Sequence, residues 1–478
     1  MPGEQIFFPG IFEIWSIVMK TDTIAAIATG MTHSGIGIIR ISGEEAVEIA
    51  DKIFKTPGKK ISLKNVKSHT IHYGFIYDGN ILLDEVMVSV MLAPKSFTTE
   101  NTVEINCHGG ILMMNRILEL VIKNGARIAQ PGEFTKRAFL NGRIDLSKAE
   151  AVMDVISSRN EMALKNSVNQ LRGSVYSAII KLREEIIYEI AFIESALDDP
   201  EHISLNGYTE KLSNKIDNLL NSVNKMILSA DNGKIVKEGI NTVIVGKPNA
   251  GKSSLLNLLV GEEKAIVTDV AGTTRDILEE NIKLHGIGLN IIDTAGIRFT
   301  EDVVEKIGVE KAKKYALDAD LIVYVVDSST KFDENDYEIM ELIQDKKCVV
   351  LLNKTDLEAK ISESDLKSKL NEDVVIIKTS TKENIGIDEF ENSVKDMFFT
   401  GTILDNDEVM ITNMRHKEAL IDTYESLKQV KRSLMDDMPE DFYSIDLMSA
   451  YASLGMIIGE EVGEDLVNEI FSKFCMGK

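Results

Sequence analysis

The stretch Gly246-Lys247-Pro248-Asn249-Ala250-Gly251-Lys252-Ser253, directly after the apolar run Val243–Val245, decides the fold of the centre of this 478-residue chain. It has the spacing G-x-x-x-x-G-K-S of a phosphate-binding loop. Its glycines let backbone N–H groups close around phosphate oxygens, Lys252 can reach the β- and γ-phosphates, and Ser253 can ligate Mg²⁺. The pattern therefore predicts a strand, a loop and a helix within an α/β module.

Three motifs later in the chain indicate that the bound nucleotide is GTP. In Asp293-Thr294-Ala295-Gly296 the aspartate can reach the water shell of the metal, and the last N–H can sense a γ-phosphate. In Asn353-Lys354-Thr355-Asp356 the final carboxylate can accept from N1–H and the amine of guanine, whereas adenine has the opposite donor pattern. Ser380-Thr381-Lys382 fits the loop that completes a base pocket. Four motifs in this order make a set of ordinary turns an improbable interpretation.

The segment between the first two motifs is predicted to close over the bound nucleotide. We expect Thr274 to approach Mg²⁺ and the γ-phosphate; the alternative is a polar loop that only caps a strand. The residues of this segment predicted to contact GTP are Thr268, Asp269, Val270, Ala271, Gly272, Thr273 and Thr274. Those of the phosphate loop are Asn249, Ala250, Gly251, Lys252, Ser253 and Ser254.

Two residues set this module apart from many GTPases. Ile297 follows the second motif, where a glutamine often orients the attacking water, and an isoleucine cannot do so by hydrogen bonding. The nearest later carboxylates that could take over are Glu301, Asp302 and Glu305. The side-chain oxygen of Asn249 could help to bind a monovalent cation, which would supply the positive charge that an arginine supplies elsewhere.

Net charge, cysteine content and the length of apolar runs limit the classes of protein to which this chain can belong. The formal net charge of −23 disfavours nonspecific nucleic-acid binding, so any RNA contact must use local basic patches or another protein. The three cysteines, Cys107, Cys348 and Cys475, are far apart, which excludes a disulfide framework and suits a reducing cytoplasm. No apolar run reaches transmembrane length, so we expect no membrane span and a cytoplasmic location. Residues 1–18 lack a basic n-region and are interpreted as an extension; a short membrane-surface anchor is the alternative.

Outside the predicted GTPase module, the sequence shows two further patterns. Short β-rich runs with glycine turns and one helical stretch predict an α+β domain; the runs are Thr23–Ala28, Gly35–Ile41, Ile81–Met91 and Thr102–Cys107, and the helical stretch is Gly110–Lys123. Apolar residues at helical spacing before and after the module predict a helical bundle. We expect one helical domain with the P-loop α/β domain inserted in it; two separate bundles are the alternative. The expected domains are residues 1–18 (extension), 19–141 (α+β), 142–235 (helical, first part), 236–401 (GTPase) and 402–478 (helical, second part).

The flanking residues resemble the MnmE (TrmE) family of tRNA-modification GTPases from about Met19 to Lys478. The motifs that carry the resemblance are Gly35–Gly43, Ser96–Glu100, His108–Gly110, Pro131–Leu146, Gly272–Asp276 and Phe474–Lys478. Ordinary GTPases share only the central motifs, so this combination is specific.

The resemblance implies a homodimer that works with the FAD- and NADH-using partner MnmG (GidA), tRNA being contacted mainly through that complex. It implies modification of C5 of the wobble uridine, at position 34, with an aminomethyl or carboxymethylaminomethyl group. The one-carbon unit would come from 5,10-methylene-tetrahydrofolate, or 5-formyl-tetrahydrofolate, bound by the amino-terminal domain. It also implies GTP hydrolysis activated by K⁺ without an arginine finger.

The resemblance also assigns residues. Arg40, Glu100, Arg143 and Lys478 fall on folate-binding positions, although some members have lysine where Arg143 stands. The implied K⁺ ligands are Asn249, Thr268, Val270 and Thr273, and those for Mg²⁺ are Ser253 and Thr274. Glu305 would orient water through a bridging water, and with Lys252 and Thr274 it completes the implied catalytic set. Guanine recognition falls to Asn353, Lys354, Asp356 and Ser380.

Other interpretations stay open at this point. Cys475 is either a small residue at a helix end or part of the modification centre. A regulatory or ribosome-assembly GTPase switch would use the same central motifs, but it has no need of the amino-terminal domain or of the tail from Cys475 to Lys478. A folate enzyme with a vestigial GTPase is disfavoured because every nucleotide motif is intact.

Overall fold

A computed structural model describes residues 22–58, 61–203, 207–262, 279–284, 287–292, 319–344, 346–371, 374–398, 409–475 and 477. These residues form two compact units. The first holds the described residues up to Met153, Gln170–Ile187 and those from Tyr451 on; the second holds Asp154–Asn169 and Tyr188–Ala450. Within these ranges, no helix has the length and apolar character needed to cross a membrane.

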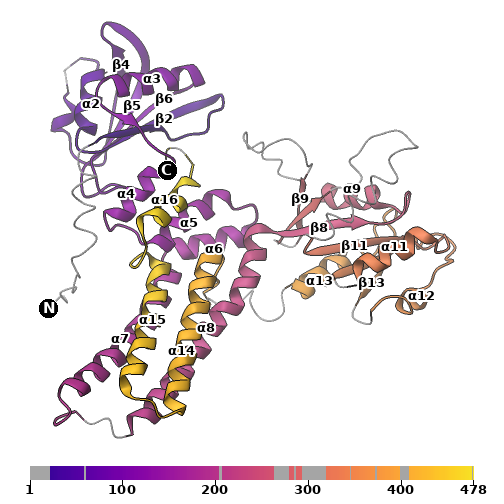
Figure 1. Ribbon diagram of the computed structural model, residues 1–478. Helices are drawn as coiled ribbons and strands as arrows, with labels where there is room; N and C mark the ends of the chain where they lie inside the picture. Colours follow the sequence, from indigo (N-terminus) through magenta and orange to yellow (C-terminus); the bar gives the residue numbers. More distant parts are fainter. Residues whose placement is uncertain are drawn as a thin grey trace. The chain divides into compact units, whose positions relative to one another are not determined.

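The first unit contains a seven-stranded sheet in the order β3-β4-β5-β6-β2-β1-β7, antiparallel except for the β1–β7 pair (Figure 1). Its strands are β1 (Ile24–Ile27), β2 (Ser34–Ser42), β3 (Phe54–Lys55), β4 (Thr70–Asp78), β5 (Ile81–Met91), β6 (Thr102–Gly109) and β7 (Arg127–Ile128). Two helices, α2 (Ala46–Ile53) and α3 (Ile111–Lys123), pack on one face, and a short 3₁₀ turn, η1 (Leu63–Asn65), precedes β4.

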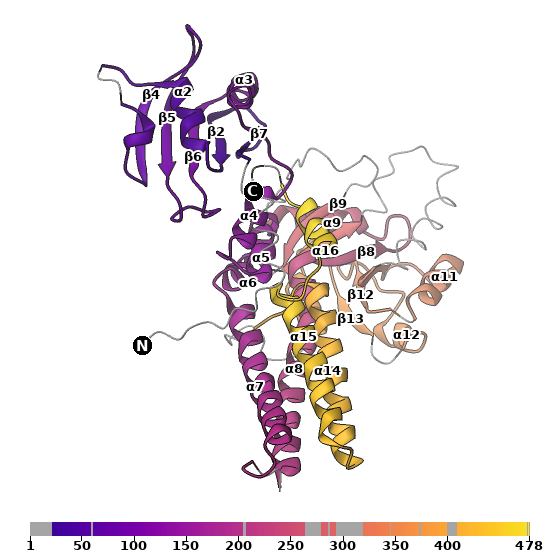
Figure 2. The ribbon, with the colours of Figure 1, turned by 60° about the vertical axis from the view of Figure 1, so that its left-hand side comes forward.

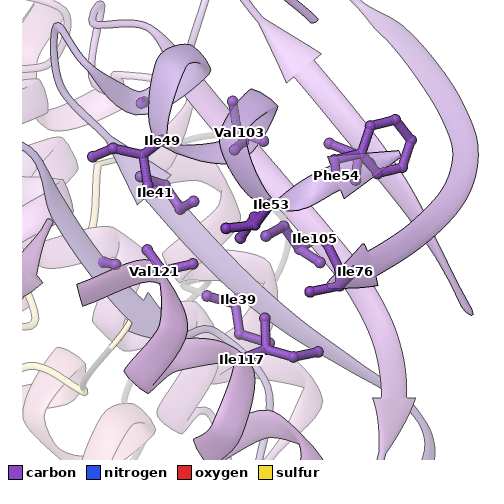
Figure 3. Packing of buried hydrophobic residues seen from close by; sticks show 14 of the residues in the cluster. Ile39, Ile41, Ile49, Ile53, Phe54, Ile76, Val103, Ile105, Ile117 and Val121 are labelled. Atoms are coloured by element: carbon purple, nitrogen blue, oxygen red, sulfur yellow. The ribbon is translucent and has the colours of Figure 1, made fainter. Parts of the chain in front are cut away.

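The core of this sheet follows from the two-residue period of its strands. Figure 3 shows Ile39 and Ile41 of β2 beside Ile105 of β6, facing the helix residues Ile49 and Ile117. The intervening positions, such as Arg40, point to the other face and are less buried. The alternation therefore places the polar side chains of β2 and β6 together, away from the core.

The helical part of the chain is divided by the predicted GTPase module. The helices before the module are α4 (Glu133–Leu140), α5 (Leu146–Ser157), α6 (Glu161–Leu171), α7 (Ser174–Asp198) and α8 (Tyr208–Glu238). Those after it are α14 (Met414–Met435), α15 (Glu440–Ile458) and α16 (Glu464–Ser472). Long helices α8 and α14 lie side by side in both views of the ribbon (Figures 1 and 2).

The two chain ends of the inserted module meet at the end of α8. Ile411 N donates to Ser229 Oγ at 3.2 Å, and a Cβ added to Gly233 would overlap the carbonyl oxygen of Ile411. Lys417 of α14 also pairs with Asp231 of α8 at 2.5 Å. A glycine is required at position 233 because the segment before α14 crosses the helix so closely.

The module itself is built on a six-stranded sheet in the order β13-β12-β11-β8-β10-β9, parallel except for β9. Its strands are β8 (Ile240–Val245), β9 (Glu279–Leu284), β10 (Ile287–Ile292), β11 (Leu321–Asp327), β12 (Cys348–Asn353) and β13 (Val375–Lys378). Its helices among the described residues are α9 (Lys252–Glu262), α11 (Glu334–Ile343), α12 (Glu363–Lys367) and α13 (Ile387–Phe398). Ala163 of α6 and Val236 of α8 join the apolar core of this sheet.

This architecture confirms the expected fold class. An α+β sheet domain, helices on both sides of the module and a P-loop α/β module are all present. The domain boundaries given above stay predictions, and the expected extension of residues 1–18 lies outside the described residues.

Candidate functional site

The phosphate loop connects β8 to α9 and depends on its glycines. Gly246 has φ 150° and Gly251 has φ 108°, values that residues with a Cβ rarely adopt. A Cβ on Gly246 would overlap Val325 O of β11, and one on Gly251 would overlap the side-chain nitrogen of Asn353. The loop therefore needs small residues both for its backbone conformation and for its close approach to two neighbouring strands.

Polar groups of the loop are placed for phosphate and cation chemistry. Lys252 Nζ lies against the loop and donates to Gly246 O at 2.6 Å and to Lys247 O at 2.7 Å. Ser253 and Ser254 lie in the first turn of α9 and are exposed. Asn249 is exposed, at φ 62°. Exposed oxygens at a helix N-terminus fit an anion accompanied by a hard cation.

Asn353 connects the phosphate loop to the loops that are predicted to bind the base. Its Nδ2 donates to Ala250 O at 2.8 Å, and its Oδ1 accepts from Thr381 N at 3.2 Å and from Thr379 Oγ1 at 3.4 Å. The side chain is 1% exposed, so it is positioned to organise the loops from inside. Three of the four sequence motifs therefore meet at one edge of the sheet.

Hydrogen bonds join the two motifs that are predicted to bind the base. Asp356 accepts a hydrogen bond of 2.9 Å from Ser380 Oγ, which is fully buried. Thr355 donates from N and Oγ1 to Thr379 O at 3.2 and 3.0 Å, while Lys382 is exposed. The Asp356 carboxylate is thereby fixed at the surface, where a base with paired N–H donors can reach it.

Lys354 is held by an aspartate that the sequence motifs do not include. Its Nζ pairs with Asp327 Oδ2 at 2.6 Å, at the end of β11. Burial alone would raise the pKa of Asp327, but hydrogen bonds from Lys354 and Ser329 lower it below its usual value. Asp327 ends an apolar strand just as Asn353 does, and that parallel is the signal in the sequence that could have revealed it.

Lys247 anchors the start of the phosphate loop to α11. Its Nζ pairs with Asp336 at 2.6 Å and with Asp333 at 3.1 Å. Asp336 is 1% exposed and also accepts from Tyr324 OH at 2.8 Å. Burial would lower the pKa of Lys247, but the two carboxylates raise it, so the ammonium stays charged. The motif treats position 247 as variable, so sequence reasoning missed this contact.

Many predicted residues lie outside the described part of the chain. They are the loop residues Thr268, Asp269, Val270, Ala271, Gly272, Thr273 and Thr274; the motif Asp293, Thr294, Ala295 and Gly296; Ile297, Glu301, Asp302 and Glu305; and Lys478.

In the first unit, Arg40 and Glu100 are both engaged by neighbouring residues. Arg40 Nε pairs with Glu104 at 2.8 Å, and its NH1 donates to Gly477 O at 2.8 Å. Glu100 accepts from Ser42 Oγ at 2.7 Å and from Arg137 at 3.0 Å. The segment near the end of the chain therefore lies beside β2.

Arg137 is the centre of a buried ionic network. It is 3% exposed and pairs with Glu100, with Glu133 at 3.1 Å and with Asp22 at 2.8 Å. Burial would lower the pKa of Arg137, but the carboxylates raise it. Burial would raise the pKa of Glu133, yet Arg127, Gln130 N and Arg137 lower it. Arg137 and Ser42 lie inside the quoted sequence motifs, but their partners are set by tertiary packing.

Arg143 lies on the rim of a pocket of about 580 Å³. Its guanidinium stacks over the Phe97 ring at 5.0 Å. The lining residues are His69, Met91, Pro94, Lys95, Ser96, Phe97, Thr99, Asn141, Gly142 and Arg143. Arg143 thus contacts Phe97, which lies on the same loop as Glu100, although Glu100 does not line this pocket.

The three cysteines differ in their environments. Burial raises the pKa of Cys107 to about 11 and that of Cys348 to about 12. Cys475 is exposed, and its carbonyl oxygen accepts from Gly132 N at 3.3 Å. Only Cys475 among the three is both accessible and close to the residues around Arg40 and Gly477.

Comparison with known proteins agrees with this arrangement. The family model "MnmE helical domain" matches residues 146–475, and the model "GTP-binding protein TrmE N-terminus" matches residues 23–143. The tRNA modification GTPase MnmE of Lachnoclostridium phytofermentans is 56% identical over 460 residues, covering 96% of this chain and all of that protein. The protein of the same name from Thermoanaerobacter pseudethanolicus is 47% identical over 462 residues, with the same coverage.

Among solved structures, the G domain of the T. maritima FeoB iron transporter is similar to 33% of this chain and 97% of its own. Its identity is 28% and its TM-score 0.26, too low a score to carry an argument. The family models and the full-length relatives decide the assignment: the chain belongs to the MnmE family of tRNA modification GTPases.

Proposed function

We propose that this chain is a K⁺-activated GTPase that acts, as a homodimer in the cytoplasm and together with MnmG, on the wobble uridine of tRNA. The product would carry an aminomethyl or carboxymethylaminomethyl group at C5. The one-carbon unit would come from a tetrahydrofolate bound in the amino-terminal sheet domain, and FAD and NADH would act only in the partner. The junction at Asn353 supports the GTPase part, because it joins the phosphate loop to the loops that we assign to guanine.

Hydrolysis is assigned to residues around that junction. Lys252 would transfer its hydrogen bonds from loop carbonyls to phosphate oxygens, and Ser253 with Thr274 would hold Mg²⁺. Asn249 would hold K⁺ with Thr268, Val270 and Thr273. The exposed oxygens of Asn249 and Ser253 fit hard cations. When bound, the two cations supply positive charge against the phosphates.

The cation assignment is tested by GTP turnover in K⁺ and in Na⁺. We expect faster turnover in K⁺, and we expect Asn249→Ala to remove the difference between the two salts. The matched control is Asn335→Ala, at an exposed position of α11 in the same module. Equal turnover of the unaltered chain in both salts would contradict the K⁺ assignment.

Water positioning is assigned to Glu305. We expect Glu305→Ala to cut turnover about 10²-fold or more, with nucleotide affinity nearly unchanged. Glu301→Ala and Asp302→Ala serve as controls with the same loss of one charge. If Glu305→Ala turned over normally and one control did not, the role would pass to that carboxylate.

The modification itself is tested in cells that lack this protein. Mass spectrometry of their tRNA should show loss of the C5 group at the wobble uridine, restored by the unaltered gene. Calorimetry with 5-formyl-tetrahydrofolate should show binding by the full chain. Normal tRNA together with no folate binding would instead favour a regulatory or ribosome-assembly switch.

A further inference from the structure

We propose that the pocket beside Arg143 binds the carboxylates of a folate's glutamate tail, with Lys95 as a second anchor, and that the chain thereby prefers polyglutamylated folates. This inference rests on the folate-binding function proposed above. It adds an anchoring residue and a ligand preference to that site.

The charge of the pocket is opposite to that of the chain. Its ten lining residues include Lys95, Arg143 and His69 but no aspartate or glutamate, in a chain with a net charge of −23. The apolar part of the wall comes from Met91, Pro94 and Phe97. A ligand that suits this lining has an aromatic or apolar body and carries negative charge.

The two cations of the pocket are available to a ligand. Within the described residues Lys95 has no ion pair, and the guanidinium of Arg143 stacks on Phe97 without pairing with a carboxylate. In the same unit Arg40, Arg127 and Arg137 are each paired with at least one carboxylate. Arg143 and Lys95 therefore do not serve the internal ionic network, and both side chains are exposed at the pocket.

Hydrogen bonds fix the pocket wall before any ligand binds. Asn141 Nδ2 donates to Thr98 O at 2.7 Å, which joins the end of α4 to the loop that carries Lys95. Ser96 Oγ donates to Glu100 O at 2.6 Å and closes that loop on itself. A preformed wall loses little entropy on binding, so even exposed charges there can contribute to affinity.

The loop from Lys95 to Glu100 has two sides with different chemistry. The Glu100 carboxylate is turned to Ser42 and Arg137, and it is an acceptor suited to the paired N–H donors of a pterin ring. Lys95, Phe97 and Thr99 line the pocket. A folate has N–H donors on its pterin ring, an aromatic ring in the middle and carboxylates on its glutamate tail. The loop offers a matching group for each part: the Glu100 carboxylate, the Phe97 ring and the Lys95 ammonium.

The experiment compares three ligands on the full chain by calorimetry: 5-formyl-tetrahydropteroate, which lacks glutamate, and the monoglutamate and triglutamate forms of 5-formyl-tetrahydrofolate. For the unaltered chain we expect affinity to rise in that order. We expect Lys95→Gln to weaken the binding of the triglutamate form about fivefold and to leave the affinity for the pteroate unchanged. Lys123→Gln, which removes an exposed charge from α3, should change none of the three.

The outcomes separate the two proposals. If no ligand bound the unaltered chain, the folate function would fail and the tail site with it. If all three bound equally well, or if Lys95→Gln weakened them equally, only the tail site would be overturned. Unchanged folate affinity with weaker tRNA binding in Lys95→Gln would assign the pocket to RNA and also overturn it. Thermal midpoints of both variants verify that each is folded.

Discussion

At the scale of single residues, the sites depend on side chains that hold other side chains. Asn353, Lys247 and Arg137 each join segments far apart in the sequence. The glycines, Lys252 and Asp356 could be predicted because their spacing is local. The partners of Arg137 and Lys247 could not, because tertiary packing sets them. Arg137 meets Glu100 where α4 packs against the loop before β6, and Lys247 meets Asp336 where the phosphate loop packs against α11.

Ser42 is predicted to position Glu100 for a folate. Its hydroxyl donates to the Glu100 carboxylate at 2.7 Å and also forms a hydrogen bond with the hydroxyl of Thr98. Ser42→Ala should weaken the binding of 5-formyl-tetrahydrofolate about tenfold, because the hydrogen bond from Ser42 to the charged Glu100 is lost. Calorimetry measures this, with Ser62→Ala on the remote η1 turn as the control and Ser42→Thr as the rescue. Unchanged affinity in Ser42→Ala would remove the positioning role.

The Arg137 network predicts a loss of stability in acid. The pKa of Glu133 is lowered from 4.5 in the folded chain, so its contribution is present above about pH 4.5 and is lost as pH falls through the folded value. Glu133→Gln should therefore lower the thermal midpoint near neutral pH, and the gap to the unaltered chain should narrow in acid. Differential scanning fluorimetry across pH measures the gap, and a gap independent of pH would contradict the prediction.

At the scale of elements, the sequence predicts those with clean periods and misses the mixed ones. The strand Ile81–Met91 is found as predicted, but β4 and α2 were not anticipated. β4 mixes His72 and Gly74 with apolar residues, and α2 is only eight residues long. The break between α5 and α6 also depends on tertiary contacts, since Asn160 both caps α6 and donates to Val236 O of α8.

Lys247 is expected to couple the phosphate loop to α11. Lys247→Ala leaves Asp336 buried without its cation, which should destabilise the module by roughly 3 kcal/mol and weaken GDP binding. Lys247→Arg should restore both properties in large part, and Lys331→Ala, an exposed neighbour, should change neither. Chemical denaturation and nucleotide fluorescence measure the two effects. Full GDP affinity in a stable Lys247→Ala variant would show that the anchor does not support the loop.

At the scale of the whole molecule, the inserted module is fastened where its two chain ends meet. Gly233 of α8 and Ile411 are in close contact, and Ser229 bonds the same segment. Gly233→Ala should force Ile411 away from α8 and destabilise the packing of α14. We expect a lower thermal midpoint, whereas Gly463→Ala, where φ is −71° and an added Cβ meets nothing, should have a smaller effect. An unchanged midpoint in Gly233→Ala would mean that the close approach is not needed for stability.

The three cysteines differ in exposure, so that a thiol reagent can label one of them selectively. Cys107 and Cys348 are buried thiols with high pKa values, so a maleimide or nitroxide reagent at neutral pH should attach at Cys475 alone. A single spin label or fluorophore can thus be attached beside Gly132 without engineering the sequence. In a homodimer, two such labels would report by pulsed dipolar spectroscopy how far the paired chain ends move apart during each nucleotide cycle.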